Sequence, residues 1–337
     1  MIDIKLLEQL CLCNGISGDE GNVRNLIINE IKDCADDIKT DNLGNLIVFK
    51  KGKKSAKSKL MVSAHMDEVG LMVTDITSDG YLKFDEVGGI DRRVLPGKRV
   101  CVGRNGLNGV IGVKPIHLTN GDEKTAVPKM NDMYIDIGAE SREDALKYVN
   151  YGDGINFEGD FKINSKTVVT KALDDRFGCY VLINLIKSEP EYDMYFTFVV
   201  QEEVGLRGAR PAAFTVNPDF ALVIESTTAA DVAEVDASHQ VCNLSKGATV
   251  TVMDRATVYD KEMISAAFEL AEKNNISVQY KRAVAGGNDS GAIHQSRGGV
   301  RTLAVSLPSR YIHAPSTAAN LDDCESVLKL AKILSDY

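Results

Sequence analysis

The sequence predicts an α/β protein in which a mostly parallel sheet is flanked by helices and interrupted by a smaller β-rich unit. Apolar, β-branched and aromatic runs at residues 194–200 and 220–224 are typical of strands buried on both faces, as in parallel sheets. Residues 19–35 show the apolar stripe of an amphipathic helix. Between residues 71 and 164, short apolar runs are broken by frequent glycines, which indicates a small β-structure.

The length and charge of the chain narrow the classes of protein to which it can belong. With 337 residues, one large and one smaller domain are expected. The formal net charge of −9 argues against a nucleic-acid or anionic-membrane partner. The seven cysteines contain no C-x-x-C pair, which fits a reducing compartment. No apolar stretch approaches the roughly 20 residues of a membrane helix. We therefore expect a cytoplasmic protein.

The N-terminal segment is expected to lead through two helices to a first buried strand. Residues 2–11 and 19–35 have helical periodicity, and residues 40–49 have the pattern of two strands joined by a turn. The lysine-rich stretch 50–59 is expected to form a solvated hairpin turn. The strand that begins at Leu60 ends in a His-x-Asp sequence, His65-Met66-Asp67.

From Thr167 to the C-terminus, the sequence again shows the patterns of helices and buried parallel strands. The predicted elements are, in order, a helix that follows Asp174-Asp175 and runs through Ile186, strands at 194–200 and 220–225, a strand at 246–253, a helix at 260–274, a glycine-rich turn at 286–291, a strand at 298–307 and a helix at 320–335. An Asp pair at a helix entrance can act as a helix cap, and this interpretation suits Asp175 better than Asp174.

Polar side chains gather where the predicted strands end. Ligands and catalytic groups of open α/β sheets lie at the carboxyl ends of strands. The candidate residues at these positions are His65, Asp174, Glu202, Glu203, Glu225 and His313. Two histidines and several carboxylates suit a pair of divalent cations, with zinc expected first and cobalt or manganese as alternatives.

The chemistry of a pair of divalent cations suggests a separate role for each of these residues. Each ion takes one histidine and one carboxylate of its own, and one aspartate bridges the two ions. The site then keeps a net positive charge, which makes hydroxide from water at neutral pH. One carboxylate remains to take a proton, and Glu202 is the candidate because its neighbour Glu203 is assigned to an ion. Asp67 is expected to orient His65.

Five ordered motifs resemble the tetrahedral (TET) aminopeptidases, also called glutamyl aminopeptidases, over nearly the whole chain. The motifs are His65-x-Asp67, Ala172-Leu173-Asp174-Asp175-Arg176-x-Gly178, Glu202-Glu203-Val204-Gly205-x-Arg207-Gly208-Ala209, Gly286-Gly287-x-Asp289-x-Gly291-Ala292-Ile293-His294 and Arg310-Tyr311-x-His313. The resemblance implies a metal-dependent aminopeptidase that hydrolyses N-terminal residues of short peptides through a hydroxide bridging two metal ions.

The resemblance also implies a role for each site residue. One ion would be held by His65, Asp174 and Glu225, and the other by Asp174, Glu203 and His313, with Asp174 as the bridge. Glu202 would be the general base and Asp67 would orient His65. The peptide bond after the bridging aspartate would be cis. Many relatives have Asp at the position of Glu225.

At the level of architecture, the resemblance implies two domains and an assembly. Residues 1–69 and 165–337 would form the catalytic domain, with the mixed sheet of dimetal aminopeptidases and phosphorylase/hydrolase-like folds. Residues 70–164 would form an inserted β-barrel, PDZ-like dimerisation domain. Relatives assemble as dimers and as tetrahedral dodecamers, so a homo-oligomer is expected.

Other functions were weighed against this one. A dimetal carboxypeptidase or an N-acyl amino acid deacylase would use the same ligand set. An endoglucanase would use Glu202 and a second acid and would leave the histidines without a role. A non-enzymatic scaffold would not need competent residues at every position. Arg297, Arg301 and Arg310 either recognise an acidic substrate residue or are surface and interface groups, whereas His117, His239 and His294 are expected outside the group of ligands.

Overall fold

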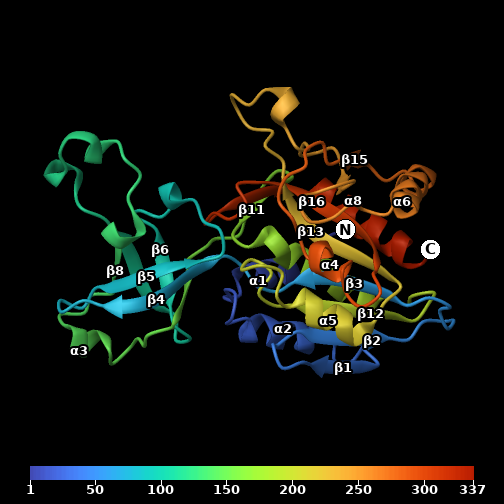
Figure 1. The fold of residues 1–337 in the computed structure, drawn as a ribbon, viewed down its shortest axis with the longest axis horizontal. Helices are drawn as coiled ribbons and strands as arrows, with labels where there is room; N and C mark the ends of the chain where they lie inside the picture. The colour runs from blue at the N-terminus through green and yellow to red at the C-terminus, as the bar shows by residue number, and fades with distance from the viewer.

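Two sheets organise the chain, and the computed structural model describes all residues, 1–337 (Figure 1). The larger sheet has eleven strands: β1 (Asp37–Thr40), β2 (Leu46–Lys50), β3 (Leu60–His65), β10 (Lys162–Asn164), β11 (Thr167–Thr170), β12 (Met194–Val199), β13 (Phe220–Thr228), β14 (Ala248–Val250), β15 (Val278–Tyr280), β16 (Arg301–Arg310) and β17 (Thr317–Asn320). The smaller is a closed barrel, which forms the narrow lobe in Figure 1.

The four central strands of the larger sheet run parallel, in the order β12-β3-β13-β16. The strands on either side, β1 and β2 at one edge and β17, β11 and β10 at the other, pair antiparallel. The mixed sheet and the inserted barrel confirm the predicted fold class. Because the central strands are parallel, their carboxyl ends meet at one edge of the sheet.

Helices cover both faces of this sheet, as the alternation of buried side chains requires. Val62 and Leu222 point into one core with α1 (Ile4–Leu12), α2 (Gly21–Ile31), α4 (Leu173–Lys187), α6 (Lys261–Lys273) and α8 (Leu321–Ser335). Their neighbours Met61 and Ala221 point into the opposite core with α5 (Ala209–Val216) and α7 (Ser290–Ile293). None of these helices is long and apolar enough to cross a lipid bilayer.

The barrel is built from six antiparallel strands and one short helix, α3 (Arg142–Ala145). Its strands are β4 (Gly70–Ile76), β5 (Leu82–Val87), β6 (Arg99–Val102), β7 (Leu107–Gly112), β8 (Tyr134–Asp136) and β9 (Gly154–Phe157). The last barrel strand is β9, whereas β10 pairs with β11 in the larger sheet. The chain therefore returns to the larger sheet at Lys162, slightly before the predicted boundary at residue 164.

Several predicted elements differ from the structure in informative ways. The lysine-rich stretch 50–59 does not close a hairpin, because β12 lies between β2 and β3. The helix α5 was not predicted; it begins with Ala209-Arg210-Pro211, and proline is tolerated in a first helical turn. The strands β15 and β17 were not predicted because each is only three or four residues long.

A buried arginine connects α4 to the chain segments around the carboxyl edge of the parallel strands. Arg176 is fully buried, and its guanidinium donates hydrogen bonds to four main-chain carbonyls, those of Leu10, Cys13, Gly15 and Met66, at 2.6–3.1 Å. It also contacts the Glu68 carboxylate at 3.1 Å, which Lys171 binds from the other side at 2.7 Å. Four of these five guanidinium contacts are buried, and the one to Cys13 is partly buried.

We expect Arg176→Met to lower the free energy of unfolding by roughly 3–5 kcal/mol, because it removes one partner of a buried charged network. Arg99→Met is the control, since Arg99 is exposed and pairs with Glu158 at 3.1 Å on the surface; its loss should stay below about 1 kcal/mol. Urea unfolding at one protein concentration measures the free energy of unfolding of the two variants and of the wild type. Equal losses in the two variants would contradict the role given to Arg176.

Candidate metal centre

Four of the candidate residues lie at the carboxyl ends of the four central parallel strands. His65 is the last residue of β3, and Glu225 lies within β13. Glu203 follows β12 by a short turn, and His313 lies in the loop after β16. In the β3–β12 pair, His65 is the register partner of Val199, so the segment after β12 starts level with the histidine. The parallel register therefore brings together residues far apart in sequence.

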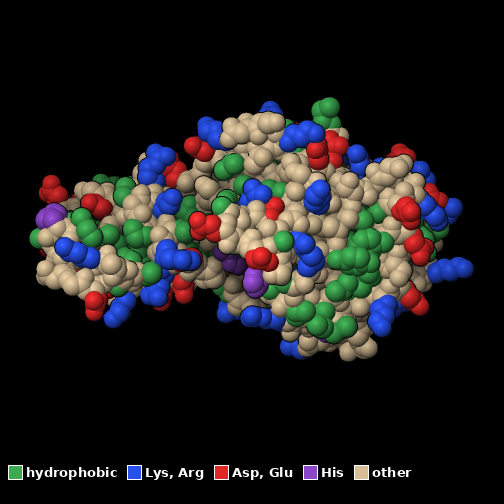
Figure 2. All heavy atoms as spheres, turned by 90° about the horizontal axis from the view of Figure 1, so that it is seen from above, with side chains coloured by type: hydrophobic (Ala, Val, Ile, Leu, Met, Phe, Trp, Pro, Cys, Tyr) green, Lys and Arg blue, Asp and Glu red, His purple; other side chains and the backbone are tan.

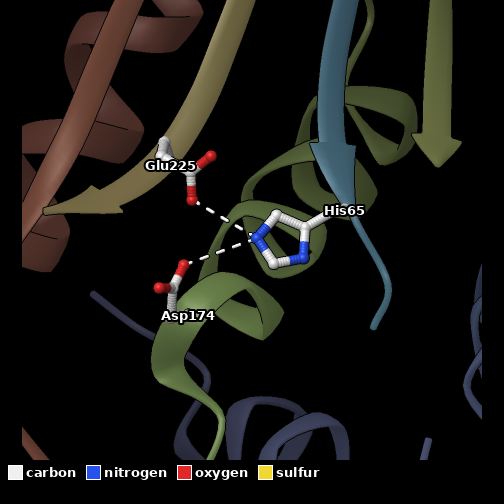
Figure 3. Close-up of side chains that lie close together, drawn as sticks. All are labelled: His65, Asp174 and Glu225. Atoms are coloured by element: carbon white, nitrogen blue, oxygen red, sulfur yellow. Dashed lines mark ion pairs between the residues drawn. The ribbon is translucent and has the colours of Figure 1, made fainter. Parts of the chain in front are cut away.

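His65, Asp174 and Glu225 form the first group of possible ligands, all three buried (Figure 3). The Nε2 atom of His65 lies 3.5 Å from Oδ1 of Asp174 and 3.4 Å from Oε1 of Glu225. The ring faces the two carboxylates, which come from α4 and β13. One ligand atom from each residue lies within 4.8 Å of the others, a spacing that can enclose a single ion.

Asp174, Glu203 and His313 form the second group, with the same 4.8 Å limit on ligand-atom separation. The Nε2 atom of His313 lies 3.4 Å from Oδ2 of Asp174 and 3.2 Å from Oε2 of Glu203. Asp174 thus presents one oxygen to each group. The His313 side chain is 38% exposed, so the second group is the more accessible one.

The Asp67 carboxylate holds the turn that carries both glutamates. It accepts hydrogen bonds from the main-chain N–H groups of Glu202 and Glu203, each at 3.1 Å, and from the Ser17 hydroxyl at 2.5 Å. The Nδ1 atom of His65 lies 3.0 Å from the main-chain oxygen of Asp67 and 3.5 Å from its carboxylate. The backbone of Asp67 therefore fixes the imidazole, while its side chain fixes the Glu202-Glu203 turn.

The first turn of α4 has non-helical backbone angles at Asp174 and Asp175. The Asp174–Asp175 peptide bond is cis, as the family resemblance implies. Asp174 has φ −85° and ψ 106°, outside the helical region. Asp175 does cap the helix, because its Oδ1 accepts a hydrogen bond from the Gly178 N–H at 2.9 Å. Asp174 is thereby free to face both histidines.

Negative charge exceeds positive charge in this pocket, and the pKa values reflect it. Burial, together with neighbouring Asp174, raises the pKa of both Glu203 and Glu225 to about 8. Burial works against the protonated imidazole of His313, but Asp174 and Glu203 raise its pKa to about 9. Burial likewise opposes ionisation of Asp174, yet hydrogen bonds from His313 and His65 lower its pKa below the usual value.

Glu202 lies beside these groups without belonging to either. It lines the same cavity of about 320 Å³ as His65, Asp174 and Glu203. Burial, with Glu225 and Asp289 nearby, raises the pKa of Glu202 well above its ordinary value. A carboxyl group in this position can exchange a proton with a molecule bound in the cavity.

The donor set fits divalent cations. Oδ1 of Asp174 and Oε2 of Glu225 are buried and accept no hydrogen bond, an arrangement that is costly unless a cation satisfies them. Nitrogen and carboxylate ligands with this geometry suit zinc, cobalt or manganese. Two dications would also balance the carboxylates that two imidazoles leave uncompensated.

Sequence reasoning did not find every residue around the cavity. Its walls away from the two groups include Thr228, Val241, Lys281, Ile312 and the loop 285–288. Lys281 follows a strand of three residues and belongs to no motif, so no local pattern pointed to it.

Figure 2 shows acidic and basic side chains interspersed over one face, with histidine atoms in the hollow where the narrow and broad parts of the molecule meet.

The other histidines and the three singled-out arginines lie apart from the two groups. None of them lines the cavity. Arg301 pairs with Asp260 at 2.7 Å, and Arg310 pairs with Asp231 at 2.7 Å. Arg297 stacks over the Phe214 ring, 3.8 Å from its centroid. These arginines are engaged in contacts within the chain.

Comparisons with known proteins place these features in context. Residues 44–330 match the model of the M42 glutamyl aminopeptidase family. A protein of Acetivibrio thermocellus is 43% identical over 327 residues, 96% of each chain. Lysyl aminopeptidase of Pyrococcus furiosus is 34% identical over 346 residues, 99% of this chain and 97% of its own.

Solved structures of TET peptidases have the same fold as this chain. The TET aminopeptidase of the archaeon Thaumarchaeota SCGC AB-539-E09 superimposes with a TM-score of 0.94 at 32% identity, covering 99% of this chain and 95% of its own. The TET1 peptidase of Pyrococcus horikoshii, which can assemble into a tetrahedron or a large octahedral shell, has a TM-score of 0.87 at 39% identity and covers 98% of both chains.

Added divalent ions should stabilise chelator-treated protein, and more strongly at pH 8 than at pH 6. The pKa values of Glu203, Glu225 and His313 lie at about 8 to 9 without ions. Ions bind the deprotonated forms, so rising pH removes competing protons and raises the apparent affinity. An ion at 100 times its Kd adds about 2.7 kcal/mol per site.

Melting temperatures with and without Zn²⁺ at the two pH values measure this effect. His117→Ala is the control, because His117 is an exposed residue outside both groups and should leave the ion effect unchanged. His65→Ala should weaken it. A melting temperature that ignores added ions at both pH values would show that the two groups bind none.

Proposed function

The chain belongs to the M42 glutamyl aminopeptidase family, and from this premise we propose that it removes N-terminal residues from short peptides with two divalent ions. As a family member it is an aminopeptidase, a peptide hydrolase. The observation that carries the mechanism is the pair of ligand groups sharing Asp174, with one further carboxylate, Glu202, in the same cavity.

We assign one ion to His65, Asp174 and Glu225, and the other to Asp174, Glu203 and His313. A bridging role is supported by the two Asp174 oxygens, because Oδ1 lies near His65 and Oδ2 lies near His313. Two divalent ions in these positions would polarise the scissile carbonyl and lower the pKa of a bound water molecule. Zinc is the first expectation for both positions, and cobalt or manganese would suit the same ligands.

Glu202 acts as the general base in this proposal. Its carboxylate takes one proton from the attacking water and later gives it to the leaving nitrogen as the C–N bond breaks. Asp67 holds the main-chain amides of Glu202 and Glu203, which keeps the base and the neighbouring ligand in a fixed relation.

The ion-binding end of the pocket also favours a free α-amino group over a blocked one. A free amino group there could contact an ion and donate hydrogen bonds to its carboxylate ligands, whereas an acetylated terminus has lost its basic nitrogen. This supports attack at the N-terminal peptide bond.

We further propose a homo-oligomer assembled from dimers, with a dodecamer as the full assembly. The residues 70–164 would act as the dimerisation domain, as the resemblance to the TET peptidases suggests. Exposed apolar side chains on this unit support the proposal: Val110, Ile116, Leu118, Val127, Leu146, Tyr148 and Tyr151. Sedimentation that returned only the 36.6 kDa of one chain at micromolar concentration would contradict it.

A peptide panel with one blocked terminus tests the activity. The metal-replete protein should cleave a short peptide with a free N-terminus and a C-terminal amide, and it should leave the N-acetylated form intact. Chelation should abolish cleavage and added Zn²⁺, Co²⁺ or Mn²⁺ should restore it. Cleavage of only the N-acetylated peptide with a free C-terminus would instead identify a carboxypeptidase. Chelator-insensitive cleavage of cellulose would identify an endoglucanase.

Glu202→Gln should keep the ions and the fold but lower turnover by about 100-fold or more, because the amide cannot accept the proton. Ion content by mass spectrometry and turnover on the same peptide are the two measurements. Glu272→Gln, a change at an exposed position of α6, is the matched control and should behave like the wild type. Turnover close to the control in a metal-replete Glu202→Gln protein would remove Glu202 from this role.

A further inference from the structure

One wall of the catalytic cavity carries a positive charge that the chemistry above does not use. The two ligand groups and Glu202 occupy one end of the cavity. Among all the residues that line it, Lys281 is the only lysine, and there is no arginine. The remaining lining away from the two groups is uncharged, with Val241, Ala285, Gly286 and Ile312 beside the polar Thr228 and Asn288. A single cation on such a wall has a strong influence on which side chains fit there.

The position of Lys281 is fixed by its backbone. It directly follows β15, and its main-chain N–H donates to the Val250 carbonyl at 2.9 Å. The strand β14, to which Val250 belongs, pairs with both β15 and β16. The residue therefore extends from the same sheet that delivers Glu225 and His313 to the cavity.

The Lys281 ammonium group has unused hydrogen-bonding capacity. Its Nζ donates to the Ala285 carbonyl at 3.0 Å, and it forms no ion pair with any carboxylate of the chain. An ammonium group carries three donors, so two remain for a ligand. Burial lowers the pKa of Lys281, although Asp254 and Glu225 oppose the shift. A partly desolvated cation without an anionic partner is the setting in which a ligand carboxylate gains most.

The other cations considered for acidic recognition are already engaged and do not line the cavity. Arg301 and Arg310 pair with Asp260 and Asp231, and Arg297 stacks on Phe214. The next residue along the chain, Arg282, is exposed and donates to Oδ1 of Asn243 at 2.6 Å. Lys281 is thus left as the free cation of the cavity.

We propose that Lys281 recognises the side chain of the substrate's N-terminal residue and makes the enzyme prefer glutamate or aspartate at that position. The inference rests on the proposed aminopeptidase function. With the α-amino group held at the ion-binding groups, the first side chain would extend toward the remaining lining of the cavity, which includes Lys281. A side-chain carboxylate there meets Lys281, whereas a lysine side chain meets a like charge. Family membership does not decide the point, since the family name is glutamyl and a relative is lysyl.

Glutamine has nearly the shape of glutamate without its charge, so a comparison of glutamyl and glutaminyl substrates isolates the contribution of the side-chain charge to kcat/KM. With the full-length, zinc-loaded protein, we expect kcat/KM for glutamyl-p-nitroanilide to exceed that for glutaminyl-p-nitroanilide by roughly 10- to 100-fold, the scale of a hydrogen bond to a charged group. Lys281→Met should bring this ratio close to one. Lys281→Glu should reverse the order of the glutamyl and lysyl substrates. Arg282→Met removes the same charge one residue away and should preserve the wild-type ratio.

The outcomes separate this inference from the proposed function. Cleavage of leucyl-p-nitroanilide by the zinc-loaded wild type supports the aminopeptidase function by itself. If that activity is present and the wild type does not prefer glutamyl over glutaminyl substrate, the role of Lys281 is overturned without any variant. An unchanged ratio in Lys281→Met overturns it as well. Failure to cleave any aminoacyl-p-nitroanilide would overturn both proposals.

Inhibition of the wild type by free amino acids gives a second readout that needs no folded variant. L-Glutamate should inhibit cleavage of leucyl-p-nitroanilide at a concentration roughly 10-fold or more below that of L-glutamine, and added salt should narrow the difference. Equal inhibition by the two amino acids would contradict an anion-binding wall.

Discussion

An excess of buried negative charge is the constraint around which the catalytic edge is built. Asp174, Glu202, Glu203 and Glu225 line one pocket with two imidazoles and one lysine, and the buried Asp67 carboxylate lies 3.5 Å from His65. Like charges at this density raise each other's pKa values and destabilise the folded chain unless cations balance them. The parallel centre of the sheet is what permits such crowding, because it aims four strand ends at one place.

The scaffold meets this constraint by giving neighbouring acids different partners. Asp67 accepts main-chain N–H groups, whereas the adjacent Glu68 turns away and is neutralised by Lys171 and Arg176. Asp175 likewise caps α4 while Asp174 faces the histidines. The successive side chains of these pairs point in different directions, so one member serves the fold and the other the site.

The sequence was sufficient to predict those features that have a local signature. A long apolar run that ends abruptly in His65, Glu202 or Glu225 predicts both a buried strand and a group at its carboxyl end. Contacts without such a signature were not predicted. The bonds from Asp67 to the amides of Glu202 and Glu203 span 135 and 136 residues. Lys281 follows a strand too short for periodicity, and the arginines' partners became visible only in the folded chain.

The barrel closes by pairing its first strand with its last, Leu71 opposite Ile155, so it returns the chain beside the point where it received it. Because the first and last barrel strands pair with each other, the two ends of the insertion lie close together when they enter the larger sheet, as the two ends of a tight turn do. The long detour consequently adds little loop-closure entropy to assembly of the catalytic edge. The barrel has an apolar core of its own, so a change in its loops leaves the strand order of the sheet that carries the ligand groups unaltered.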